Sequence, residues 1–251
     1  MPNSVSVFGI GGIDEVRPGD DLVELLLVAA KAQGTPIQSG DVLVVTQKVV
    51  SKAEGRLVRL KDVVPSQFAS AVAGLDDRDP RYVEVILREA RRIIRMDHGV
   101  IITETHHGFR CANSGVDASN MPKDGEVALL PEDPDASALA IRSNIQRRNG
   151  HDVAVIVSDT FGRPWREGAV NVAIGIAGLE PILDYRGQED DYGHVLQTTA
   201  IAVADELASA AELVTNKSTR IPAAIIRGYS FRSAAGGVQS LLRQPAQDLF
   251  R

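Results

Sequence analysis

The sequence predicts a fold in which strands and helices are mixed along the whole chain, of the α/β or α+β class. Short runs of branched apolar residues, such as 42–45 and 153–157, are typical of strands buried on both faces. Between such runs, apolar residues recur at helical spacing, most clearly over residues 80–95. No internal repeat or linker interrupts the pattern. We therefore expect one main domain over residues 1–230, followed by a tail or peripheral helix over residues 231–251.

The first half of the chain alternates between the two kinds of element. Alternating apolar residues predict the first strand, an aspartate is expected to cap the first helix, and a glycine ends the long helix. In order, we expect a strand at 5–10, a helix over 22–32 capped by Asp20, a strand at 42–46, the helix over 80–95 ended by Gly99, and a strand at 100–103.

The second half continues in the same way. Asp133-Pro134 is a typical helix start, with a capping side chain before a proline, and Gly150 is a typical helix end. We expect a strand at 126–130, a helix from 134 to about 149, a strand at 153–157 that ends in Ser158-Asp159-Thr160, a strand at 170–176, a helix over 200–214 and a strand at 223–227. The irregular stretches 108–123, 160–169 and 186–194 are long for a compact domain, which favours a functional role.

Composition excludes several classes of protein. The 251 residues include 27 Lys and Arg against 33 Asp and Glu, and aromatic residues make up 4%, so a nucleic-acid partner is not expected. The single cysteine, Cys111, cannot form an intramolecular disulfide and is expected to be a small buried hydrophobe. No cationic leader and no apolar run of about 20 residues is present, so we expect a soluble cytoplasmic protein without a membrane partner.

Two polar segments are candidate metal sites. Asp159-Thr160 ends a predicted buried strand, where ligands of α/β sheets gather, and a carboxylate beside a hydroxyl suits a metal that bridges phosphates. The alternative is a helix cap. Asp117 could bind Mg²⁺ or Mn²⁺ and Asn120 could hydrogen-bond a ligand, but the segment around them is also typical of a turn stabilised by its own side chains.

Two basic segments are candidate anion sites. Arg163, Trp165 and Arg166 follow the Asp159 strand in one loop. Guanidinium groups bind carboxylates or phosphates through paired hydrogen bonds, and an indole can stack on a planar ligand. Lys52 follows a predicted buried strand and could meet a phosphate, although charge pairing with Glu54 and Arg56 is the alternative.

Taken together, these segments resemble the coenzyme F-420-0 gamma-glutamyl ligase family. The shared motifs occur in order between residue 5 and about residue 230, and several run for six residues or more. They are Gly-x-x-x-x-x-Pro-Gly-Asp-Asp at 12–21, Gly-Asp-Val-Leu-Val-Val at 40–45, Val-Ser-Lys-Ala-Glu-Gly-Arg at 50–56, Gly-Val-Asp-Ala-Ser-Asn at 115–120, Leu-Leu-Pro-x-Asp-Pro-Asp at 129–135, Ser-Asp-Thr-x-Gly-Arg-x-Trp-Arg at 158–166, Val-Ala-Asp-Glu at 203–206 and Ile-Pro-Ala-x-Ile-Ile-Arg-Gly at 221–228.

The resemblance implies an α+β ligase fold with mixed sheets, an intertwined homodimer, and GTP-dependent addition of L-glutamate to coenzyme F-420-0. It also implies Mg²⁺ or Mn²⁺ as cofactor, with up to two divalent ions; K⁺ is a further candidate ion. By position, the GTP contacts fall on Ile13, Asp14, Glu15, Val16, Gln47, Lys52 and Asn120, and the metal ligands on Asp117, Asp159 and Thr160. We assign catalytic roles to Lys52, Arg163 and Arg166.

The sequence departs from the family pattern at three places. Ile13-Asp14 stands where Leu-Pro is frequent, Gln47 stands where a small hydroxyl residue is frequent, and residues 215–218 lack the carboxylate expected for a second metal. A carboxylate is a poor electrophile, so phosphorylation by GTP would give an acyl phosphate that the glutamate amine can attack. The alternative functions are a metal-dependent phosphohydrolase and a non-catalytic coenzyme-binding module.

Overall fold

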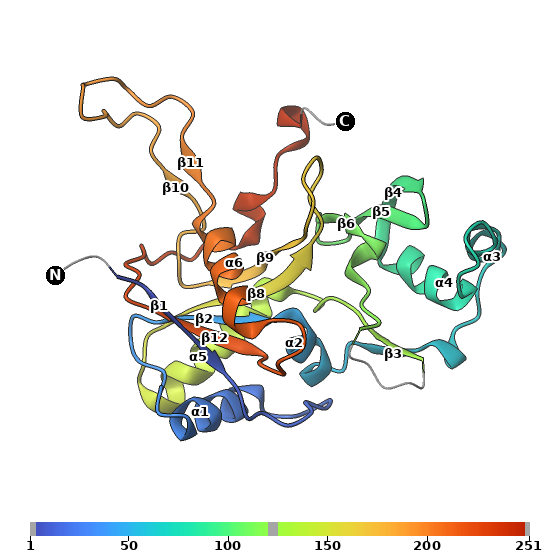
Figure 1. The fold of residues 1–251 in the computed structure, drawn as a ribbon, viewed down its shortest axis with the longest axis horizontal. Helices are drawn as coiled ribbons and strands as arrows, with labels where there is room; N and C mark the ends of the chain where they lie inside the picture. The colour runs from blue at the N-terminus through green and yellow to red at the C-terminus, as the bar shows by residue number, and fades with distance from the viewer. Residues whose placement is uncertain (1–3, 120–124, 249–251) are drawn as a thin grey trace.

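The computed structural model describes residues 4–119 and 125–248. Its centre is a five-stranded sheet in the order β1-β12-β2-β8-β9, which is shown in Figure 1. The strands are β1 (Ser6–Ile10), β2 (Val42–Thr46), β8 (Ala154–Phe161), β9 (Val170–Ala177) and β12 (Ala223–Arg227). Only β2 and β8 are parallel neighbours, and the other pairs are antiparallel. The sheet is therefore mixed, and the α+β class is confirmed.

Helices cover both sides of this sheet. In Figure 1, α1 (Leu22–Ala32) and α5 (Pro134–Asn149) lie on one side, and α6 (Val203–Thr215) lies on the other. The branched apolar residues of the strands are buried between these layers, as the sequence predicts, and form the main core with the helices. Among the described residues, no helix is long and apolar enough to cross a bilayer.

A second lobe packs beside the main sheet. It contains β3 (Leu57–Arg59), β7 (Glu126–Ala128), α3 (Gln67–Gly74), α4 (Pro80–Glu89) and the sheet β4 (Ala90–Asp97), β5 (Val100–Thr105) and β6 (Arg110–Ala112). The lobe has its own buried cluster, with Val83, Ile86 and Ile101 at its centre. The short helix α2 (Gln47–Ala53) follows β2 and contacts both β7 and β8, so it lies between the two lobes.

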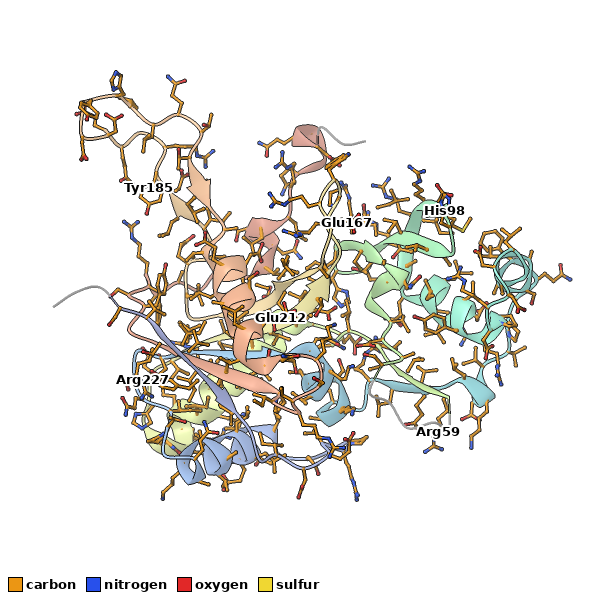
Figure 2. All side chains as sticks on the ribbon, viewed as in Figure 1. Arg59, His98, Glu167, Tyr185, Glu212 and Arg227 are labelled. Atoms are coloured by element: carbon orange, nitrogen blue, oxygen red, sulfur yellow. The ribbon has the colours of Figure 1, made fainter. Side chains whose placement is uncertain are left out.

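An arm and a tail complete the chain. The arm begins at β10 (Leu183–Asp184) and returns at β11 (Ala200–Ile201), and Figure 1 shows it projecting away from the body. Its side chains stand apart from the other elements in Figure 2, where Tyr185 marks its base. The tail contains two short 3-10 turns, η3 (Val238–Leu241) and η4 (Pro245–Gln247), in place of a regular helix.

The predicted helix over 80–95 is wrong in its second half. Helix α4 ends at Glu89, and the next residue begins β4, which pairs with β5. The turn between these strands contains His98 and Gly99, both with positive φ, which is the backbone of a tight hairpin. Gly99 is thus a hairpin residue and not a helix end. The pairing of β4 with β5 overrides the helical spacing of the apolar residues in 90–95.

Other boundaries differ by a few residues. Helix α1 is capped by Asp21, which accepts from the Glu24 amide at 3.1 Å, while Asp20 accepts from the Arg17 amide at 2.8 Å. Helix α6 starts at Val203 and not at 200, because residues 200–201 pair with β10. The predicted start and left-handed glycine cap of α5 are confirmed.

Candidate active site

A cavity of about 830 Å³ opens where β2 and β8 end. These two strands are parallel, so their carboxyl ends lie at the same edge of the sheet. Thr46 comes from β2, and residues 158–160 come from β8. The remaining walls come from residues 13–16 before α1, from α2, from Asp117, and from residues 212–222 at the end of α6 and the segment after it. Most residues predicted for a nucleotide or metal therefore lie around one space.

Asp159 is a half-buried carboxylate of this cavity. Its pKa is raised to about 6, first by burial and also by the negative charge of Asp117, against a hydrogen bond from the Thr160 amide. The positive charges of Lys217 and Lys48 act in the opposite direction. The charge of Asp117 is thus close enough to act on Asp159, although the two residues come from different lobes.

Asp117 is held differently. Burial alone would raise its pKa, but a 2.8 Å ion pair with Lys48 and a 2.6 Å hydrogen bond from the Ser119 amide keep it below the usual value. Lys48 also donates to the carbonyl and hydroxyl oxygens of Ser119. In this structure an ammonium group therefore sits on the carboxylate that the sequence assigns to a metal.

Thr160 has its hydroxyl proton already engaged. Its Oγ1 donates to Oδ1 of Asn171 at 2.7 Å, and its amide donates to Asp159 at 2.8 Å. Asn171 is buried and also lines the cavity. Because the proton points to Asn171, the lone pairs of the Thr160 oxygen are available to a cation.

The positive and negative side chains that line the cavity nearly balance. Lys52 is 6% exposed and pairs with Glu15, whose side chain is open to solvent. Among the described residues, the lining cations are Lys48, Lys52, Lys217 and Arg220, and the lining carboxylates are Asp14, Glu15, Asp117, Asp159 and Glu212. The excess of one carboxylate means that the cavity alone would repel a polyphosphate, whereas a bound divalent cation would make it attractive.

The donor set fits one hard divalent cation. Two carboxylates and a hydroxyl are the oxygen ligands that Mg²⁺ and Mn²⁺ prefer, and such ions usually keep waters or substrate oxygens as further ligands. Within the described residues, no group of three His, Cys, Asp or Glu side chains is placed to hold a metal by itself. Asp117, Asp159 and Thr160 would therefore hold an ion that shares its coordination with a ligand.

The predicted nucleotide residues are mostly found at the cavity. Residues 13–16 form its open rim, with Asp14 and Glu15 exposed and Val16 buried. Gln47 is buried, and its amide nitrogen donates to Ser51 at 2.7 Å and to the Leu129 carbonyl at 2.8 Å. Asn120 lies outside the described residues.

The predicted arginines lie outside this cavity. Arg163, Trp165 and Arg166 belong to the loop between β8 and β9, and none of them lines the cavity. Arg163 donates to the carbonyls of Glu167 and Gly168 within the loop and lines a second hollow of about 590 Å³ beside α6. Trp165 is 77% exposed.

Sequence reasoning missed several lining residues. Lys48 adjoins a residue assigned to the nucleotide, yet its bond to Asp117 joins segments 69 positions apart in the chain. Glu212 lies inside a predicted helix, where a carboxylate usually faces solvent, but it lines the cavity. Only the packing of α6 against β1, β9 and β12 brings this acidic side chain to the site.

Comparisons with known proteins place the chain among the ligases. A family model described as F420-0:Gamma-glutamyl ligase matches residues 11–228. Proteins named coenzyme F420:L-glutamate ligase are similar over nearly the whole chain. The one from Methanothermobacter thermautotrophicus is 47% identical over 98% of this chain and 99% of its own length. The one from Methanopyrus kandleri is 47% identical over 94% of each, and the one from Methanocaldococcus jannaschii is 43% identical over 86% of each.

The chain therefore belongs to the F420-0:gamma-glutamyl ligase family and is a ligase enzyme. The resemblance drawn from the sequence motifs is confirmed. Two of the segments that carry this resemblance, residues 158–160 and Lys52 of α2, lie at the cavity.

Proposed function

We propose that this enzyme joins L-glutamate to coenzyme F-420-0 in a GTP-dependent reaction that passes through an acyl phosphate. The observation that carries the proposal is the cavity at the ends of β2 and β8, whose lining combines Asp117, Asp159 and Thr160 with three lysines. Such a set suits a nucleotide and a divalent cation. The printed names of the relatives supply the two substrates to be joined.

The chemistry requires activation of a carboxylate. Transfer of the γ-phosphoryl group of GTP to a carboxylate oxygen of the acceptor would release GDP and give the acyl phosphate. Attack by the glutamate amine on the acyl carbon then forms the amide and releases inorganic phosphate. The protein contributes mainly by positioning the reactants and by offsetting negative charge.

The residues of the cavity divide into charge-offsetting and ion-holding groups. Lys52 is buried on α2, and its ammonium would meet a phosphate after leaving Glu15, which is exposed. Asp117, Asp159 and Thr160 would hold Mg²⁺ or Mn²⁺, whose positive charge would stabilise the triphosphate. Residues 13–16 and Gln47 would border the nucleotide at the rim. A second divalent ion, or K⁺, would need further oxygen ligands, for which Glu212 of the same lining is a candidate.

The acceptor is assigned to the loop between β8 and β9. Arg163 and Arg166 would bind a carboxylate or phosphodiester of the coenzyme, and Trp165 would stack on its planar ring. Arg163 is held in place by the carbonyls of its own loop, at 2.8 and 3.1 Å. This loop continues directly from Asp159 and Thr160, so the acceptor would approach the phosphate from the same strand end.

We also propose that the protein forms a homodimer in which the arm contacts the second copy. Residues 185–199 project from the body, and Tyr192 and Val195 are 87% and 53% exposed there. Exposed apolar side chains on a projecting hairpin favour burial against a second copy. Sedimentation analysis of the protein with and without residues 187–197 tests this. A monomeric wild-type protein would contradict it.

One experiment tests the proposed reaction. Purified protein is incubated with GTP, Mn²⁺, L-glutamate and coenzyme F-420-0, and GDP and the glutamylated product are measured together. We expect GDP release that depends on both glutamate and acceptor. GTP hydrolysis that is independent of them would favour a phosphohydrolase instead, and absence of product would contradict the ligase proposal.

A further inference from the structure

Ser158 is a buried polar residue to which the proposed reaction assigns no role. Its side chain is 2% exposed, it lines the cavity, and among the described residues its Oγ has no hydrogen-bond partner. The neighbouring Asp159 and Thr160 are accounted for as candidate ligands of the ion, but nothing assigns a role to Ser158. Buried hydroxyl groups are nearly always hydrogen-bonded, so one without a partner at a ligand cavity calls for an explanation.

The fold explains why no protein group satisfies this hydroxyl. Ser158 lies inside β8, and its register neighbours are Thr46 on β2 and Ala173 on β9. The Thr46 amide donates to the Pro222 carbonyl and the Ala173 amide donates to the Asp205 carboxylate, both at 2.9 Å, and Ala173 has no polar side-chain atom. The pairing of β8 with β9 also shifts register between Val157 and Ser158, so that one residue of β9 has no partner there. Irregularities of this kind change the direction of side chains beside active sites.

Ser158 belongs to the covered part of the cavity lining. Asp14 and Glu15 of the same lining are exposed, whereas Ser158 is buried and is followed in the chain by the ion-binding candidates Asp159 and Thr160. Side chains two positions apart on a strand share a face, so a ligand oxygen held at Thr160 would lie on the same side of β8 as the Ser158 side chain. Rotation about χ1 moves Oγ among three staggered positions, so the hydroxyl can turn toward such an oxygen.

We propose that Ser158 is a further binding residue, whose hydroxyl donates a hydrogen bond to a phosphoryl oxygen of the bound nucleotide. The proposal rests on the proposed function, because it takes the nucleotide as the occupant of the cavity. A phosphoryl oxygen is the favoured acceptor because it is anionic and strengthens the hydrogen bond of a buried hydroxyl. The carboxylates of the site instead supply the ligands that a divalent cation prefers.

The test compares Ser158→Ala with Ser137→Ala. Ser137 is a suitable control because its hydroxyl is also buried but is fully engaged, with Glu54 at 2.6 Å and the Asp133 carbonyl at 3.1 Å, and it does not line the cavity. Binding of a non-hydrolysable GTP analogue with Mn²⁺, binding of Mn²⁺ alone, and melting of the free protein are measured for wild type and both variants.

We expect Ser158→Ala to weaken binding of the Mn²⁺–nucleotide complex by about tenfold, with Mn²⁺ alone bound as in wild type. Its melting temperature should be unchanged or higher, because the variant removes a buried hydroxyl without a partner. Ser137→Ala should show the reverse, with a lower melting temperature and unchanged nucleotide binding. Ser158→Cys keeps a side chain of similar shape but is a weak donor, so it should resemble Ser158→Ala in binding.

Three outcomes would overturn the inference. Unchanged nucleotide affinity in Ser158→Ala would remove the hydrogen bond to phosphate. An equal loss of affinity for Mn²⁺ alone would make Ser158 a ligand of the ion. Full affinity in Ser158→Cys would make the loss one of packing. In each case wild-type protein still binds the nucleotide, and only the inference fails. If wild-type protein binds no nucleotide, the proposed function fails first.

Discussion

Two carboxylates of this enzyme, both at least half-buried, have opposite electrostatics. Glu104 lies on β5 in the second lobe, and its pKa is lowered, first by the hydrogen bonds of Arg92 at 3.0 and 2.8 Å. Arg110 and Arg91 stand 3.5 and 3.6 Å from it. Asp159 lies at the cavity, and burial raises its pKa to about 6. No guanidinium or ammonium forms an ion pair with Asp159 within the described residues.

The difference separates a structural carboxylate from a functional one. Glu104 receives its counter-charges from neighbouring strands of its own sheet, so its ionised form is stabilised by the fold alone. Among residues 4–119 and 125–248, Asp159 has no ion-pair partner, so a cation from outside would stabilise its ionised form. A buried carboxylate with a raised pKa in a cavity is a candidate functional group for this physical reason. Substitutions at the two sites should consequently have opposite effects on activity and stability.

Asp159→Asn should produce the largest loss of activity. The variant keeps size and some hydrogen bonding but loses the charge that would offset a divalent cation. We expect turnover to fall by about a hundredfold or more, with weaker Mn²⁺ binding. Kinetics over a range of Mn²⁺ concentrations measure both effects. Near-wild-type turnover at limiting Mn²⁺ would remove Asp159 from the metal site.

The same variant should stabilise the metal-free protein in a pH-dependent way. The pKa of Asp159 rises from 3.8 to about 6 on folding, so the folded state favours the protonated carboxyl. Ionisation of Asp159 therefore costs no stability below pH 4, and the cost is complete once the pH has risen through 6. Asparagine does not titrate. Relative to wild type, Asp159→Asn should therefore gain up to about 3 kcal/mol at pH 7 to 8 and nothing near pH 3.5. Denaturant unfolding at several pH values tests this, and a pH-independent difference would contradict it.

Much of this site could be predicted from the sequence because its residues belong to local motifs. Asp159-Thr160 follow an apolar run that is typical of a buried strand. The end of that strand lies at the edge of the sheet and places both residues at the cavity. The contacts that define the electrostatics could not be predicted in this way. Lys48 reaches Asp117 across two lobes, and Glu104 meets Arg92 only because residues 90–97 form a strand in place of the predicted helix.

Lys52→Met should produce the next largest effect. Lys52 is buried, yet its partner Glu15 is exposed and can move away when an anionic ligand arrives. We expect the KM for GTP to rise by about tenfold or more, because a buried ammonium contributes strongly to phosphate binding. Lys31→Met on the exposed side of α1 is the matched control and should leave KM unchanged. Equal KM values for all three proteins would show that the Lys52–Glu15 pair is only structural.

Glu104→Gln should affect stability and spare activity. Removing this charge leaves several guanidinium groups of β4 and β6 without their shared partner. We expect a loss of about 2 kcal/mol at pH 7 and turnover within about twofold of wild type. Because the pKa of Glu104 is lowered on folding, the wild-type advantage should be full above pH 4.5 and shrink as the pH falls below it. A large loss of turnover in fully folded Glu104→Gln would show that Glu104 also has a functional role, as proposed for Asp159.

Cys111 lies between the two regions and should have the smallest effect of all. It is on β6 beside Arg110, which contacts Glu104, and it is 7% exposed. Burial and the negative charge of Asp159 raise the pKa of its thiol to about 12, so it stays protonated and cannot act as a nucleophile. Cys111→Ala should therefore keep turnover within about twofold and cost about 1 kcal/mol of stability, the scale of a small buried side chain.

In folded wild-type protein at pH 8, the Cys111 thiol should react with an alkylating reagent at least about a hundredfold more slowly than in unfolded protein. Rapid labelling of the native protein, or a large loss of turnover in Cys111→Ala, would mean that the neighbourhood of Asp159 contains a reactive group besides its carboxylates and lysines.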